Sequence, residues 1–230
     1  MREKIILKTS DGQEIVGNYL EVPNAKGAGL LLHMMPSTKE SWEVFAEELV
    51  KARLSSLAID LRGHGKSSGG PDGFMQFSDK EHQESILDTR TGIEFLKNKG
   101  ISADKIFLAG ASIGANLSLQ CQKENSELKV AILLSPGLNY RGILGGELAR
   151  QLKNNQAIFV AASEHDCGYR DVSDRQDRCA SEMARDIFDG APVSEKKLKI
   201  FSNSAHGTTM LVRNAGFASE VIEWLNKIYG

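Results

Sequence analysis

The sequence predicts an α/β fold in which a mostly parallel, twisted sheet of about eight strands carries helices on both faces. Short apolar runs alternate along the chain with longer segments whose apolar residues recur at helical spacing. Runs that are apolar throughout are typical of parallel strands, because helices cover both faces of a parallel sheet. A pair of opening strands around the turn Asp11-Gly12 adds an antiparallel hairpin at one edge of the sheet.

The predicted strands begin with this hairpin and continue through the apolar runs, at residues 4–10, 13–22, 27–34, 56–60, 105–110, 130–136, 156–163 and 197–202. Helical patterns lie between them and close the chain, at residues 42–50, from 78, from about 112, 147–152, 173–188 and 217–228. The pair Ser78 and Glu81 has the spacing of a capping box, which would open a long helix. In such a sheet the active groups gather at the carboxyl ends of the strands, so we look for candidate residues there.

Size and charge narrow the class of protein. A chain of 230 residues with 41% apolar and 25% charged residues suits a single globular domain over residues 1–230. The formal net charge is −2 with both signs scattered, and without a basic stripe we expect no nucleic-acid partner. The longest apolar stretch, residues 27–35, is too short to span a membrane, and the N-terminus shows no secretory signal. We therefore expect a cytoplasmic protein without a membrane partner, and its oligomeric state stays open.

Cysteine and histidine spacing gives no metal site. Cys121, Cys167 and Cys179 are too few and too irregular for a disulfide framework or a zinc site. A bond between Cys167 and Cys179 is one alternative, but we expect free thiols in a reducing compartment. The five histidines have no spacing of the H-E-x-x-H kind. The expected cofactor is none, and the expected metal is none.

A candidate nucleophile lies between a predicted strand and a predicted helix. Residues 110–114 read Gly-Ala-Ser-Ile-Gly, the pattern G-x-S-x-G. A serine raised above a sheet on a sharp turn has a strained backbone, and the residues two positions before and after it must be small. The turn also places the Ile113 backbone N–H at a helix N-terminus, where it can stabilise an oxyanion. We predict that Ser112 is the nucleophile.

A nucleophilic serine requires a base, and the base requires an acid that orients it. His206 follows the predicted strand at 197–202, and Asp166 follows the strand at 156–163. The chain order is therefore Ser112, Asp166, His206, with each residue after its own strand. The rival acids lie less suitably relative to the end of the strand; they are Glu164, Asp171 and Asp174.

These motifs resemble those of the α/β-hydrolase family, and the resemblance covers nearly the whole chain. Residues 33–36, His-Met-Met-Pro, follow the third strand where family members usually carry His-Gly. Residues 60–67, Asp-Leu-Arg-Gly-His-Gly-Lys-Ser, look like the Asp-x-Arg-Gly-x-Gly-x-Ser loop that follows the fourth strand in the family. The resemblance implies an α/β-hydrolase fold with a Ser-His-Asp triad.

The resemblance also assigns roles in the two loops. It implies that the Met35 backbone N–H, with Met34 as the alternative, supplies the second oxyanion donor, and that His33 and His64 order their loops. Met34 stands where the family has glycine. The two methionine side chains either line an acyl pocket or pack in the core.

The predicted reaction is two-step acyl transfer through an acyl-enzyme. Serine at this turn argues against branches that resemble the family but use aspartate there. Only residues 137–155 separate two strands where many family members insert a helical cap, which predicts a minimal cap and an open site. We therefore expect a small, lid-poor carboxylesterase or thioesterase acting on a small or medium acyl ester or thioester. The alternatives are a serine aminopeptidase-like amide hydrolase and a non-catalytic homologue that binds a small molecule.

Overall fold

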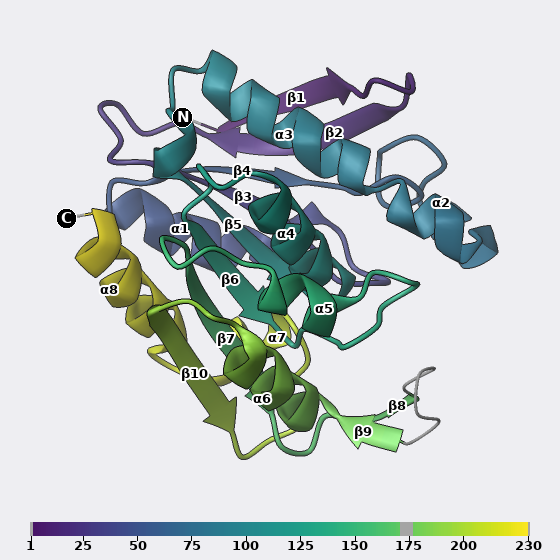
Figure 1. Ribbon diagram of the computed structural model, residues 1–230. Coiled ribbons are helices and arrows are strands. Elements are labelled where there is room, and N and C mark those ends of the chain that lie inside the picture. Colours follow the sequence, from purple (N-terminus) through teal and green to yellow (C-terminus); the bar gives the residue numbers. More distant parts are fainter. Residues whose placement is uncertain (1, 171–176, 230) are drawn as a thin grey trace.

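The computed structural model describes residues 2–170 and 177–229. Within them, eight strands form one sheet in the order β1-β2-β4-β3-β5-β6-β7-β10 (Figure 1). The first two strands are antiparallel to their neighbours, whereas the pairs from β4 through β3 to β10 are parallel. The strands are β1 Arg2–Lys8, β2 Glu14–Leu20, β3 Ala28–Leu32, β4 Ser55–Ile59, β5 Ile106–Ala111, β6 Val130–Leu134, β7 Ala157–Ser163 and β10 Glu195–Phe201. The predicted fold class, including the opening hairpin, is confirmed.

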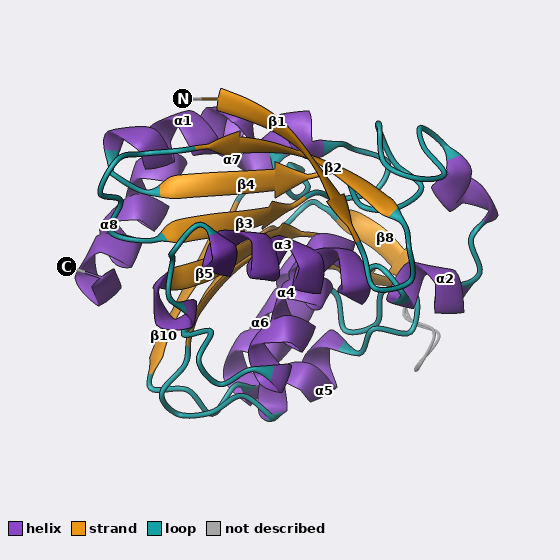
Figure 2. Ribbon diagram, turned by 90° about the horizontal axis from the view of Figure 1, so that it is seen from above, coloured by secondary structure: helices purple, strands orange, loops and turns teal. Residues whose placement is uncertain are grey.

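Helices cover both faces of this sheet. One face carries α1 (Glu43–Lys51), α7 (Thr209–Arg213) and α8 (Phe217–Tyr229), and the other carries α3 (Ile86–Asn98), α4 (Ile113–Glu124) and α6 (Ala180–Gly190) (Figure 2). Alternation along the strands supplies both cores, since Ile106 and Leu108 belong to one buried cluster while Phe107 and Ala109 belong to the other. Short 3₁₀ helices lie at Lys39–Trp42 (η1), Gly73–Gln76 (η2) and Ala103–Lys105 (η3).

The capping box at Ser78 is present, but the long helix predicted behind it is divided. The Glu81 N–H donates to Ser78 Oγ (3.3 Å), and the Ser78 N–H donates to Glu81 Oε2 (2.7 Å). The helix α2 ends after Asp79–Gln83, and α3 begins at Ile86. Tighter i→i−3 bonds, such as Ser85 N–H to the His82 carbonyl (3.2 Å), replace the α-helical ladder between them.

The segment after β7 differs most from the prediction. The polar helix expected over 173–188 begins only at Ala180, and two short strands precede it: β8 (Cys167–Arg170) and β9 (Asp177–Cys179). These strands pair antiparallel and place Cys167 opposite Cys179, and the two residues form a disulfide. The expectation of free thiols is therefore wrong for this pair, while Cys121 is buried and free. The polar residues of β8 and β9 have no apolar period, so the sequence gives no pattern from which their pairing could be predicted.

The connection between β6 and β7 is short, as predicted. It holds one helix, α5 (Gly145–Arg150), which begins two residues earlier than expected from the sequence. Among the residues that the structure describes, no helix is both long and apolar enough to cross a membrane. The connection between β6 and β7 therefore holds loops and this single short helix.

Candidate active site

The three predicted triad residues lie after three parallel strands of one sheet. Ser112 follows β5, Asp166 follows β7, and His206 follows β10. Since β5, β6, β7 and β10 are consecutive neighbours with parallel register, their carboxyl ends meet at the same edge. The fold therefore brings these residues to one side of the molecule, as the sequence predicts.

Ser112 occupies the sharp turn between β5 and α4. Its backbone has φ 54° and ψ −118°, a conformation that is unfavourable for a residue with a Cβ atom, and its N–H donates to the Leu134 carbonyl (2.8 Å). The flanking glycines permit the turn. A Cβ atom on Gly110 would lie 2.0 Å from the Gly114 carbonyl oxygen, and one on Gly114 would lie 2.4 Å from the Leu32 carbonyl oxygen. No larger residue fits either position without displacing main chain.

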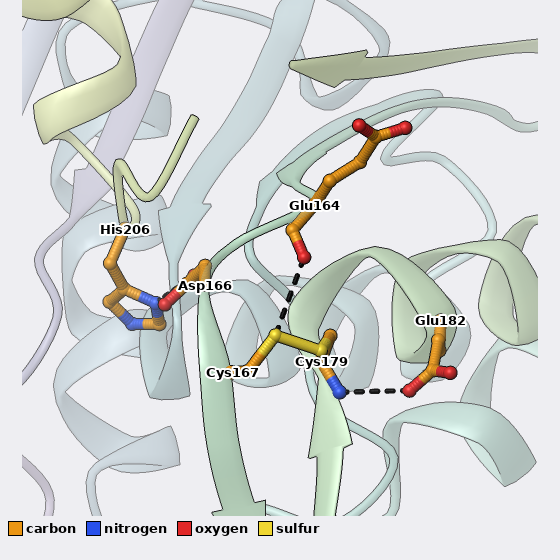
Figure 3. Close-up of a disulfide and its surroundings, with 6 residues drawn as sticks. All are labelled: Glu164, Asp166, Cys167, Cys179, Glu182 and His206. Atoms are coloured by element: carbon orange, nitrogen blue, oxygen red, sulfur yellow. Dashed lines mark hydrogen bonds and ion pairs between the residues drawn. A yellow bond between two sulfur atoms is a disulfide. The ribbon is translucent and has the colours of Figure 1, made fainter. Parts of the chain in front are cut away.

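The predicted acid and the predicted base are in contact. His206 Nδ1 lies 2.7 Å from Asp166 Oδ2, and Figure 3 shows the imidazole edge facing the carboxylate. Backbone bonds join the two loops that carry them: the Glu164 N–H donates to the Phe201 carbonyl (2.8 Å), and the His165 N–H donates to the Asn203 carbonyl (2.9 Å). Because a carboxylate only accepts, Nδ1 carries the proton in this contact, and Nε2 is the basic nitrogen of a neutral imidazole.

The loop of His206 also packs on the loop of Ser112. Gly207 has φ 52°, and a Cβ atom there would lie 3.1 Å from the Ala111 side chain and 2.5 Å from Met34 Sδ. The residue next to His206 therefore lies against the residue next to Ser112. Met34 is partly buried and packs against the same core cluster as Ala111, so the structure places its side chain in packing.

The loop that holds the predicted second oxyanion donor is ordered by His33. Its Nδ1 donates to the Met34 carbonyl (2.9 Å), its Nε2 accepts the Leu61 N–H (3.0 Å), and the Met34 carbonyl also accepts the Ser37 N–H (2.8 Å). Burial lowers the pKa of His33 to about 4, which keeps the imidazole neutral and able to accept. Met35 follows in this turn, partly buried against the other core cluster.

The second histidine of the loops, His64, orders the glycine-rich loop after β4. It is buried, its Nδ1 donates to the Arg62 carbonyl (3.0 Å), and its ring stacks on Phe74 at a centroid distance of 4.2 Å. Within the same loop, Asp60 accepts bonds from the backbone and the ammonium of Lys39 (2.9 and 2.7 Å) and from the Lys66 N–H (2.9 Å). The side chains of this motif therefore hold the loop together.

Of the rival acids, Glu164 is exposed, and Asp171 and Asp174 lie outside the described residues. Two residues at the site were missed from the sequence. Ser135, directly after β6, is a hydrogen-bond partner of Asp166. Tyr140 is a hydrogen-bond partner of Ser112, and burial raises the pKa of Tyr140 to about 12. The position of Ser135 at the carboxyl end of a predicted strand was the signal that could have drawn attention to it. Nothing in the sequence marks Tyr140.

A doubly covered parallel sheet with a strained serine after its central strand, and a carboxylate–imidazole pair two strands away, defines the α/β-hydrolase class. Residues 23–163 match the family model described as serine aminopeptidase, S33. The match covers more than half of the chain, and this protein belongs to that family of hydrolases. A comparison with curated proteins finds no match.

Solved structures agree with this class. The esterase Pf2001 of Pyrococcus furiosus is 19% identical with a TM-score of 0.78, over 100% of this chain and 93% of that one. A cold-adapted esterase from an Arctic intertidal metagenomic library is 19% identical with a TM-score of 0.73, over 98% and 93%. The proline iminopeptidase of Mycobacterium smegmatis is 12% identical with a TM-score of 0.73, over 99% of each chain. At these identities the likeness establishes the fold.

Proposed function

We propose that this protein is a serine hydrolase that cleaves a small or medium acyl ester or thioester through an acyl-enzyme on Ser112. The observation that carries the proposal is the 2.7 Å contact between His206 and Asp166, in a loop that packs against the strained serine turn. Backbone strain persists where surrounding structure enforces it, and such strain clusters at active sites. This supports turnover over a role in binding alone.

The proposed first step is attack by the serine. His206 Nε2 takes the proton of the Ser112 hydroxyl as Oγ adds to the carbonyl carbon, while Asp166 holds Nδ1–H and stabilises the imidazolium that forms. The backbone N–H groups of Ile113 and Met35 donate to the oxyanion of the tetrahedral intermediate. The imidazolium then protonates the leaving alcohol or thiol, and the acyl group remains on Ser112.

The second step repeats the chemistry with water. His206 removes a proton from a water molecule that attacks the acyl-enzyme, and the tetrahedral intermediate collapses to release the acid and the Ser112 hydroxyl. The chain's own residues supply each proton transfer, so the proposal includes no cofactor. The short cover between β6 and β7 favours substrates that reach the site without a deep pocket.

The amide-hydrolase alternative is favoured by the description of the matched family and by the proline iminopeptidase among the similar structures. The esterases among those structures favour an ester. Rates on p-nitrophenyl esters, acyl thioesters and aminoacyl p-nitroanilides, measured side by side, separate the two. A higher kcat/KM on the anilides would replace the ester proposal.

The nucleophile is tested by covalent labelling. A fluorophosphonate should add one mass increment at Ser112, and Ser112→Ala should lose both labelling and ester hydrolysis. Ser126, an exposed serine beyond the end of α4, provides the control, since Ser126→Ala removes a hydroxyl far from the turn. Labelling at another residue, or full activity in Ser112→Ala, contradicts the proposal.

Two broader proposals accompany this function. We propose that residues 1–230 form one domain, because two buried clusters cover the two faces of a single sheet. The cytoplasmic location stays a prediction, and the Cys167–Cys179 bond removes the thiol argument for it, since disulfides persist mainly in oxidising compartments. Cell fractionation with thiol trapping before lysis would test the location and the bond together.

A further inference from the structure

Ser135 lies between the loops of the acid and the base. It follows β6, the strand that separates the nucleophile's strand β5 from the acid's strand β7, and its side chain is 0% exposed. Its N–H donates to the Ala161 carbonyl of β7 (2.7 Å), and its carbonyl accepts the Tyr140 hydroxyl (3.5 Å). The main chain of Ser135 is therefore held on both sides.

The hydroxyl of Ser135 makes two further bonds, both to the triad loops. It donates to Asp166 Oδ2 (3.3 Å), and it accepts the N–H of Gly207 (3.0 Å), the residue after His206. Oδ2 is the same carboxylate oxygen that lies 2.7 Å from His206 Nδ1. One buried hydroxyl thus touches the oxygen that orients the base and the main chain that carries the base.

The backbone of Ser135 gives an independent reason to assign its side chain a role. Its φ is 49°, in the left-handed region that glycine adopts without steric cost and other residues adopt at a cost. A serine here is strained in a way that a glycine would not be. The two hydrogen bonds of the Ser135 hydroxyl, which glycine could not make, offset that strain.

We propose that Ser135 is a positioning residue of this site, whose hydroxyl fixes the Asp166 carboxylate and the loop of His206 relative to each other. The inference rests on the proposed function of the triad. The donated bond limits rotation of the carboxylate about its Cβ–Cγ bond and occupies one lone pair of Oδ2. The bond that the hydroxyl accepts from Gly207 satisfies a buried N–H, which would cost free energy if it were left without an acceptor.

Two variants remove the hydroxyl with opposite effects on the backbone. Ser135→Ala keeps the strain at φ 49°, and Ser135→Gly relieves it. A positioning hydroxyl predicts that both variants lose kcat by about 10-fold on a p-nitrophenyl ester with KM unchanged, while Ser135→Gly is the more stable of the two. The control is Ser56→Ala, because Ser56 is also 0% exposed but its hydroxyl has no partner among the described residues.

A second readout does not depend on turnover. With one donor removed from Oδ2, the carboxylate becomes a stronger acceptor, so the NMR signal of the His206 Nδ1–H proton should move downfield in both Ser135 variants and stay in place in Ser56→Ala. An unchanged signal, with kcat within 2-fold of the parent, overturns the inference. So does a defect in Ser135→Ala that Ser135→Gly restores, since that pattern assigns the effect to the backbone. Full activity in Ser112→Ala would instead remove the proposed function, and the proton signal would still decide the role of Ser135.

Discussion

The substitution Gly114→Ala tests how closely α4 must approach the loop that holds Met35, the proposed second oxyanion donor. A Cβ atom on Gly114 would lie 2.4 Å from the Leu32 carbonyl oxygen and 2.8 Å from the His33 carbonyl oxygen. The Leu32 carbonyl ends β3 and the His33 carbonyl follows it, two residues before Met35. Main chain cannot rotate away as a side chain can, so α4 and the end of β3 must move apart.

The size of the effect follows from that distance. Restoring an ordinary contact of about 3.4 Å from 2.4 Å requires a shift of about 1 Å, which separates the N–H groups of Ile113 and Met35. A misplacement of about 1 Å at a catalytic group costs about 10²-fold in rate. Stability changes less, because overpacking costs about 1–3 kcal/mol while replacing glycine inside a helix returns about 1 kcal/mol.

The assay compares kcat on a p-nitrophenyl ester with the free energy of unfolding in urea. We expect kcat to fall about 10²-fold and the free energy of unfolding by no more than about 2 kcal/mol. Gly73→Ala is the matched control, since a Cβ atom there would lie no closer than 3.7 Å to its neighbours. The reasoning is refuted if Gly114→Ala keeps kcat within 2-fold of the parent, or if the variant does not fold.

Three further predictions follow from the site. Asp166→Asn should lower kcat by about 10⁴, because it removes the charge and the tautomer control at the 2.7 Å contact. Glu164→Gln, at an exposed position, should leave kcat unchanged, and equal losses would contradict the assignment of the acid. The His33 imidazole should titrate near pH 4 in NMR spectra. The folded-state pKa of His33 lies below the unfolded value of 6.5, so the stability that the neutral ring contributes is complete above pH 6.5. About 3 kcal/mol of the free energy of unfolding is lost as the pH falls toward 4. Titration of His33 near pH 6.5 would show that the ring is not buried as described. Because the connection between β6 and β7 holds only the short helix α5, hydrolysis of a short-chain triglyceride should show no steep rise when the substrate passes its solubility limit. Such a rise would reveal a mobile lid.

Local features of the sequence determined the fold class and the three triad candidates. The run over β5 is apolar on both faces, which is typical of a covered parallel strand. Gly110 and Gly114, two positions before and after Ser112, permit the strained turn that follows this strand. These are short-range requirements, set by periodicity and sterics within a few residues, and a sequence displays them directly. The assignment of serine, acid and base then followed from the strand after which each residue lies.

Tertiary structure decided what those residues contact. Asp166 bonds to His206, 40 positions away, and Ser135 bonds to Gly207, 72 positions away. Both bonds depend on the order of neighbouring strands in the sheet, β5-β6-β7-β10. The disulfide likewise depends on the pairing of β8 with β9, two short strands without an apolar period. Hydroxyls, thiols and carboxylates carry no periodic signal of their own, so their partners are fixed only when packing of the apolar core has placed the strand ends beside one another.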